Sequence, residues 1–112
     1  MDERRRAARI SVSFSVQWQG SWARRDGVLA DLSIGGCFIL TDTLIKVRET
    51  VRVEIQIPKG QLQFTGEVLY IAEERGFALR FTDASADDLK RLQWLIKAEE
   101  YRAERGTTAD LK

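Results

Sequence analysis

Four arginines stand within the first nine residues of the chain, at Arg4, Arg5, Arg6 and Arg9. A guanidinium group is a planar fork of N–H donors that can pair with two phosphate oxygens at once, and the same fork matches the O6/N7 edge of guanine. The net charge of the whole chain is only +1, which argues against a nucleic-acid polymer as the ligand. Taken alone, a short charged run of this kind is usually a solvated tail.

A second stretch whose side chains could bind a ligand is "DLSIGG", from Asp31 to Gly36. Asp31 and Ser33 are two residues apart on a predicted strand, so both side chains leave the same face. A carboxylate accepts hydrogen bonds from N–H donors such as N1 and N2 of guanine, and Gly35 and Gly36 would let a ligand approach the backbone. The alternative is local: short polar side chains bonded to nearby backbone, followed by a glycine turn.

The sequence lacks the residues that several kinds of catalysis and metal binding require. The chain has no histidine and one cysteine, Cys37, so it lacks the commonest general base, a partner to activate the cysteine as a nucleophile, and the usual zinc ligands. The carboxylate pairs at 73–74 and 87–88 fall where a turn and a helix start are expected, where a structural role suffices. We therefore expect no enzyme activity, no metal and no cofactor.

The elements that would position these groups follow from hydrophobic periodicity. Apolar residues alternate with polar ones from Ile10 to Trp18, the pattern of a half-buried strand. Similar patterns predict five more strands and, with the apolar period changing near Ser85, a helix to about Arg105 that Gly106 ends. The other predicted strands span Val28–Ile34, Cys37–Leu40, Val51–Ile57, Leu62–Tyr70 and Phe77–Phe81.

Three local features add smaller expectations. Gly66, inside a predicted strand, indicates a bulge or a bend. Ser85 with Asp88 three residues later resembles a capping box, which makes Ser85 the expected N-cap of the helix. In the irregular segment before Val51, we expect three apolar residues to cap the core: Leu44, Ile45 and Val47.

Six strands and one helix in 112 residues predict a single domain, either a small antiparallel barrel or a sandwich closed by a helix. We expect a basic arm at residues 1–9, the domain at 10–105 and a tail at 106–112. No apolar run is long enough for a membrane span, so we expect no membrane insertion. The single cysteine fits a reducing compartment, and the expected location is the cytoplasm.

The two stretches together resemble the motifs of the PilZ domain family, bacterial receptors for the second messenger cyclic di-GMP. The family carries RRxxxR before its first strand and [D/N]xSxxG after it. Here Arg4, Arg5 and Arg9 match the first motif, and Asp31, Ser33 and Gly36 match the second. The resemblance implies a six-stranded antiparallel barrel with a C-terminal helix, and a flexible N-terminal arm that folds over the ligand.

The same resemblance implies roles for individual residues. Arg5 and Arg9 would hold phosphate and guanine, and Arg4 would stack on or bridge a second ligand molecule. Asp31 and Ser33 would bind a guanine edge, with Gly35 and Gly36 admitting the ligand. These implied site residues are Arg4, Arg5, Arg9, Asp31, Ser33, Gly35 and Gly36. Signalling would then pass to an unidentified downstream protein, because ordering of the arm changes the contacts that a partner can make.

Other readings remain open. The chain could be a PilZ-like interaction domain that binds no nucleotide, or a barrel that binds oligonucleotides through basic and aromatic residues. On the predicted helix, Trp94 and Tyr101 lie opposite the apolar stripe of Leu89, Leu92 and Ile96. This aromatic face either packs on the barrel rim or forms a contact with a partner or a second copy of the chain.

Overall fold

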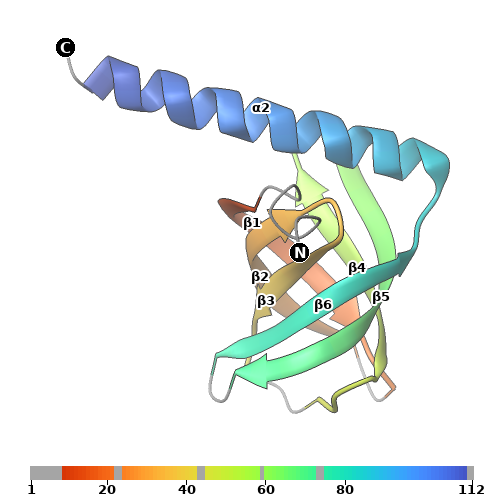
Figure 1. Cartoon of the computed structure of the whole chain (residues 1–112). Coiled ribbons are helices and arrows are strands. Elements are labelled where there is room, and N and C mark those ends of the chain that lie inside the picture. Colours follow the sequence, from red (N-terminus) through yellow and green to blue (C-terminus); the bar gives the residue numbers. More distant parts are fainter. Residues whose placement is uncertain (1–8, 22–23, 43–44, 59, 73–74, 111–112) are drawn as a thin grey trace, which may run out of the picture.

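The computed structural model describes residues 9–21, 24–42, 45–58, 60–72 and 75–110, with the side chains of the last helix described as far as Arg102. It has six strands followed by a helix (Figure 1). The elements are β1 (Ile10–Gln19), β2 (Arg24–Ser33), β3 (Gly36–Leu40), β4 (Thr50–Ile57), β5 (Gly60–Ala72), β6 (Gly76–Asp83) and α2 (Ala86–Asp110).

The strands form a closed antiparallel barrel in the order β1-β2-β3-β6-β5-β4. The ladder between β1 and β4, with Val16 opposite Ile55, closes it. Because side chains alternate across each strand, one set fills the barrel and the other faces outward. This confirms the predicted six-stranded barrel with a C-terminal helix.

The inward set forms one hydrophobic core, in which Leu29, Ile39, Ile55, Leu62 and Phe77 are fully buried. Trp18 packs its indole ring edge-on against Phe77, with 5.2 Å between ring centroids. The helix adds Leu92, Leu95 and Ile96 to the same core. Leu89, which the periodicity placed on the apolar stripe, is 38% exposed, so the buried stripe begins one turn later.

Helix α2 lies across one end of the barrel, and its last turns extend past it (Figure 1). The N–H of Asp88 donates to the hydroxyl of Ser85 at 3.0 Å, which confirms Ser85 as the N-cap. The Asp88 carboxylate accepts a hydrogen bond from the backbone N–H of Gln63, 3.2 Å away. This bond ties the start of the helix to β5.

Two predicted boundaries were wrong. β2 begins at Arg24 instead of Val28. Its first residues are charged and exposed, but they still pair with β1, as far as the pair Gln19 and Arg24. The helix continues through Gly106 to Asp110. Glycine lowers helix stability by about 1 kcal/mol relative to alanine, but it ends a helix only where the chain needs a left-handed residue.

Three smaller expectations can also be compared with the structure. The expected irregularity at Gly66 is confirmed as a register shift between Thr65 and Gly66 in the β5–β6 ladder. In the segment before β4, Ile45 packs against the core as expected, but Val47 is 50% exposed. Leu44, expected to cap the core with them, lies outside the described residues.

Candidate functional site

Five of the seven residues predicted for the site line one surface pocket of about 160 Å³. They are Arg9, Asp31, Ser33, Gly35 and Gly36. Arg4 and Arg5 lie outside the described residues, as does most of the expected arm at residues 1–9. The last arginine of the first motif and the whole of the second therefore meet on the outer face of the barrel.

The β1–β2 ladder explains this meeting. Ile10 pairs with Leu32, so Arg9 enters the first strand beside the end of β2. Leu32 points into the core and is fully buried, whereas its neighbours Asp31 and Ser33 are only half-buried and face outward. The period of two in the strand thus sends the acid and the hydroxyl of "DLSIGG" to the same side as the arginine.

Asp31 and Ser33 differ in how the protein uses them. The Ser33 hydroxyl accepts from the N–H of Gly35 at 3.3 Å and lies 3.4 Å from the carbonyl oxygen of Gly36, to which it donates. Ser33 therefore holds the turn between β2 and β3, as the local alternative predicted. Within the described residues, the Asp31 carboxylate has no hydrogen bond or ion pair, so its oxygens remain available to a ligand.

The two glycines also have different roles. A Cβ on Gly35 would meet no atom within 4 Å, so the backbone there is open to the pocket. A Cβ on Gly36 would collide with the carbonyl oxygen of Leu79 on the neighbouring strand. The absence of a side chain at Gly36 is required by packing of β3 against β6, and at Gly35 it leaves space for an incoming group.

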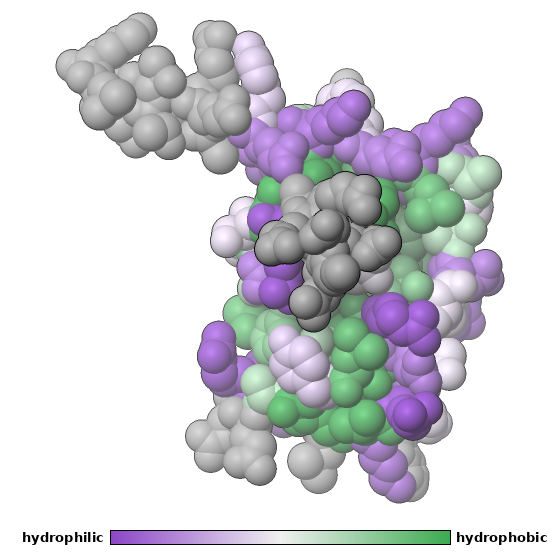
Figure 2. All heavy atoms as spheres, in the orientation of Figure 1, coloured by the Kyte–Doolittle hydropathy of each residue, from purple (hydrophilic) through white to green (hydrophobic). Residues whose placement is uncertain are grey.

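Two outward side chains of the pocket escaped the sequence analysis, Tyr70 on β5 and Arg80 on β6. Tyr70 is half exposed, and its ring centroid lies 6.4 Å from that of Phe38. The ladders place Asp31, Phe38, Ala78 and Tyr70 in one row across four strands. Three large side chains at the end of β5 are exposed, Leu69, Tyr70 and Ile71. Figure 2 shows hydrophobic atoms exposed on the barrel surface.

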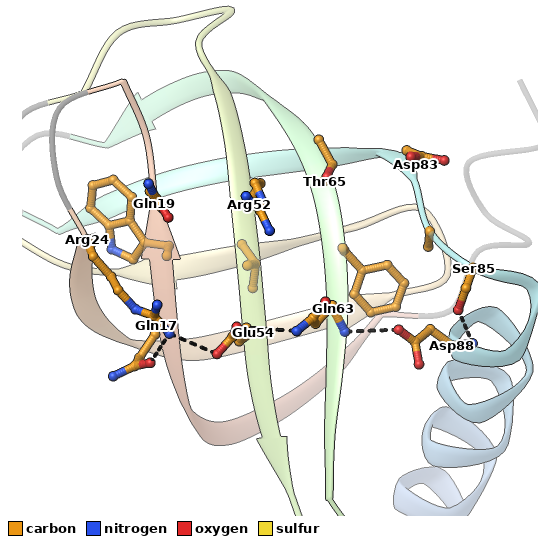
Figure 3. Close-up of a pocket in the computed structure, with 14 residues that line it drawn as sticks. Gln17, Gln19, Arg24, Arg52, Glu54, Gln63, Thr65, Asp83, Ser85 and Asp88 are labelled. Atoms are coloured by element: carbon orange, nitrogen blue, oxygen red, sulfur yellow. Dashed lines mark hydrogen bonds and ion pairs between the residues drawn. The ribbon is translucent and has the colours of Figure 1, made fainter.

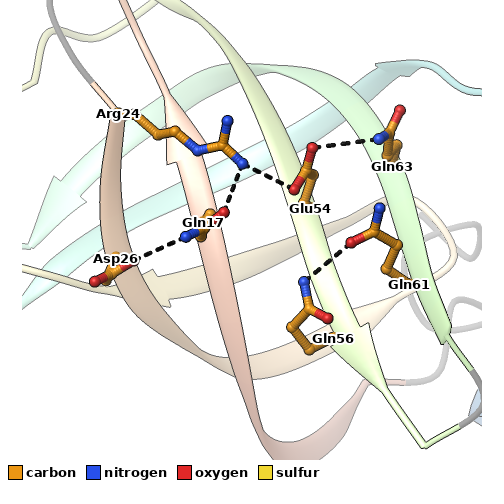
Figure 4. Close-up of polar contacts among 7 residues, drawn as sticks. All are labelled: Gln17, Arg24, Asp26, Glu54, Gln56, Gln61 and Gln63. Carbon is orange, nitrogen blue, oxygen red and sulfur yellow. Dashed lines mark hydrogen bonds and ion pairs between the residues drawn. The ribbon is translucent and has the colours of Figure 1, made fainter.

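A larger pocket of about 340 Å³ lies on the outer face of β1, β4 and β5, beside the start of α2 (Figure 3). Two of its charged groups, Arg24 and Glu54, pair with each other. The Arg24 guanidinium contacts the Gln17 amide at 2.5 Å and the Glu54 carboxylate at 3.0 Å, and Glu54 also accepts from the Gln63 amide (Figure 4). Asp83 and Asp88 also line this pocket, so its charge does not favour an anion.

The described part of the chain offers little for covalent or metal chemistry. It contains no group of three or more acidic, cysteine or histidine side chains that could hold a metal ion. Burial raises the pKa of the Cys37 thiol far above its usual value, so the nucleophilic thiolate is disfavoured. The pocket around Asp31 is equipped to bind a ligand through guanidinium, carboxylate and aromatic groups.

No helix in the described part of the chain is both long and apolar enough to cross a membrane. Comparison with characterised proteins by sequence finds no match. Comparison with solved structures finds strong similarity of fold to the PilZ domain of Escherichia coli YcgR with c-di-GMP. That match has 22% identity and a TM-score of 0.79, and covers 94% of this chain and 98% of that one.

Two longer proteins share the fold. E. coli YcgR in complex with c-di-GMP is 24% identical with a TM-score of 0.81, over 97% of this chain and 51% of that one. K. pneumoniae MrkH, as its c-di-GMP complex, is 17% identical with a TM-score of 0.79, over 92% of this chain and 55% of that one. The chain thus spans about half the length of these two proteins. Its own residues 3–98 match the PilZ domain, and the chain belongs to the PilZ domain family.

Proposed function

We propose that this chain is a receptor for cyclic di-GMP, which it binds at the pocket lined by Arg9, Asp31 and Ser33. The observation that carries the proposal is that Arg9 of the first motif meets the second motif there, with a guanidinium and a carboxylate that has no partner among the described residues on one outer face. The ligand has both guanine and phosphate, so it can use each of these groups. The similar YcgR and MrkH structures contain c-di-GMP bound to those proteins.

The roles of individual residues follow from their chemistry. Arg9 is suited to a phosphate or to the O6/N7 edge of guanine, and Asp31 to the N1 and N2 donors of guanine. Gly35 leaves room for the ligand beside the backbone. We place Tyr70 at the far side of the same site, where its half-exposed ring offers a face to a base.

The pocket by itself is too small for a whole cyclic dinucleotide. Its volume of about 160 Å³ is below the roughly 300 Å³ at which pockets for drug-sized ligands begin. The remaining contacts therefore come from another part of the chain, and the motif resemblance assigns them to Arg4 and Arg5. Ordering that arm over the ligand costs conformational entropy, so the affinity is moderate.

A binding module of this kind acts through contacts with other molecules. We propose that arm ordering alters the surface presented to a downstream protein, that the chain performs no catalysis, and that it works in the bacterial cytoplasm. The aromatic face of α2 is our candidate for a protein contact. Trp94 and Tyr101 are 60% and 61% exposed, so most of each side chain is accessible to a partner.

Isothermal titration calorimetry with three ligands tests the proposal. Cyclic di-GMP is expected to give a saturable isotherm, whereas GTP and single-stranded DNA give none at the same concentrations. Binding of DNA but not of cyclic di-GMP would favour an oligonucleotide-binding barrel. Absence of binding for all three would favour a PilZ-like interaction domain without a nucleotide ligand.

A further inference from the structure

We propose that Arg80 is an additional ligand-contacting guanidinium of the site, and that Glu67 competes with the ligand for it. This inference rests on the proposed function, because it needs an anionic ligand in the pocket beside Asp31. Neither residue belongs to the two sequence motifs. Both come to the site through the register of the barrel.

Arg80 faces outward from β6 and lines the same pocket as Arg9 and Asp31. In the ladders it lies directly opposite Gly36 on β3, which in turn lies opposite Ser33 on β2. Neighbouring strands are about 5 Å apart. Because Gly36 has no side chain, nothing at that position separates the Arg80 side chain from Ser33. The guanidinium can therefore turn toward the pocket.

On its other flank, Arg80 is held by an acid. Glu67 lies opposite Arg80 on β5, and the Nη2 atom of Arg80 lies 2.7 Å from Oε1 of Glu67. Glu67 thus stands on the side of Arg80 away from Gly36 and Ser33. The guanidinium side chain is 53% exposed, and a guanidinium has five N–H donors, so it can reach a second acceptor.

The charges lining the pocket explain why this matters for a ligand with two phosphates. Among the described residues, Arg9 and Arg80 are the cations of the pocket and Asp31 is its acid. The ion pair with Glu67 offsets much of the positive charge of Arg80 in the free protein. A ligand phosphate near Gly36 therefore competes with the Glu67 carboxylate for one guanidinium, and Glu67 lowers the affinity.

The barrel provides a matched control pair on another face. Arg24 and Glu54 form an ion pair between outward side chains at 3.0 Å, with side chains 54% and 28% exposed. The pair Arg80 and Glu67 has corresponding exposures of 53% and 28%. The two pairs are alike in solvent access, but Arg24 and Glu54 lie on strands separated by β1 and line the larger pocket described above.

A double-mutant cycle measured by calorimetry with cyclic di-GMP tests the inference. Arg80→Ala is expected to weaken binding roughly tenfold, the loss of a charge-assisted hydrogen bond. Glu67→Gln is expected to tighten binding roughly two- to fivefold, because an exposed carboxylate no longer competes. In the double variant, Glu67→Gln should not change the affinity relative to Arg80→Ala alone, because Glu67 acts on the ligand through Arg80. Arg24→Ala and Glu54→Gln should bind as the wild type does.

Each outcome separates this inference from the proposed function. Wild-type binding together with unchanged affinity in both Arg80→Ala and Arg80→Gln would overturn the role of Arg80 and leave the receptor proposal standing. Unchanged or weaker binding by Glu67→Gln would overturn the competition. Absence of binding by the wild type would overturn the proposed function, and this inference with it. Circular dichroism before each titration checks that the variants are folded.

Discussion

Gly36 lies so close to the carbonyl oxygen of Leu79 that a methyl group on its α-carbon would collide with that oxygen. The neighbouring Gly35 has no such contact, although both glycines belong to the second motif. One glycine is therefore needed for the packing of the barrel, and the other is not.

This contrast predicts different results for two conservative substitutions. Gly36→Ala is expected to lower the free energy of unfolding by about 1–3 kcal/mol, because β3 and β6 must move apart. Gly35→Ala is expected to change it by less than about 0.5 kcal/mol and to weaken binding of cyclic di-GMP. Urea unfolding and calorimetry measure the two effects. Equal stability of both variants would contradict the assigned roles.

Glu49 makes the stability of the protein depend on pH. The backbone N–H of Ser21 donates to its carboxylate at 2.6 Å and that of Lys46 at 3.1 Å, and these bonds hold the pKa of Glu49 below its usual value. The unfolded state then binds more protons in acid, so this stabilisation is complete above the unfolded pKa of about 4.3 and is lost as pH falls through the lower folded pKa.

Glu49→Gln is accordingly expected to be less stable than the wild type at pH 6, and the difference should shrink as the pH is lowered from about 5 to 3. Thermal unfolding followed by circular dichroism over this range measures it. A stability difference that stays constant with pH would contradict the ionic role of Glu49.

Cys37 is expected to be inert in the folded protein. Its side chain is 7% exposed, and burial raises the pKa of the thiol, so both access and the thiolate are disfavoured. An aromatic disulfide reagent at pH 8 should therefore label it slowly in buffer and rapidly in 6 M guanidinium chloride, about the concentration needed to unfold a stable domain. Labelling at the same rate in both conditions would show that the thiol is accessible in the native state.

The aromatic face of α2 predicts an effect on assembly without an effect on folding. Trp94→Ala is expected to change the free energy of unfolding by less than about 0.5 kcal/mol, because the side chain is exposed. It should also lower the weight-average mass found by sedimentation at high concentration. Gln93→Ala, at an exposed neighbouring position, should sediment as the wild type does. Identical masses for wild type and Trp94→Ala at every concentration would exclude self-association through Trp94.

The pattern of apolar and polar residues within single segments predicted much of this structure. The alternation from Ile10 to Gln19 and the change in apolar period at Ser85 each belong to one segment. The end of α2 was missed because Gly106 only weakens a helix. Tyr70 and Arg80 were missed for a different reason. Their place beside Asp31 depends on which strands are neighbours and in what register, and β3 pairs with β6 across the 35 residues that lie between Leu40 and Gly76. No spacing within either motif carries that information.

The central claim is that Arg9 and Asp31 bind cyclic di-GMP together, and calorimetric titration of three variants tests it most directly. The wild type should bind saturably, and Arg9→Ala and Asp31→Ala should each weaken binding roughly tenfold or more, since each removes a charge-assisted contact. Arg52→Ala, an exposed arginine in the larger pocket, should leave binding unchanged. Wild-type affinity in both Arg9→Ala and Asp31→Ala, with the proteins folded, would contradict the claim.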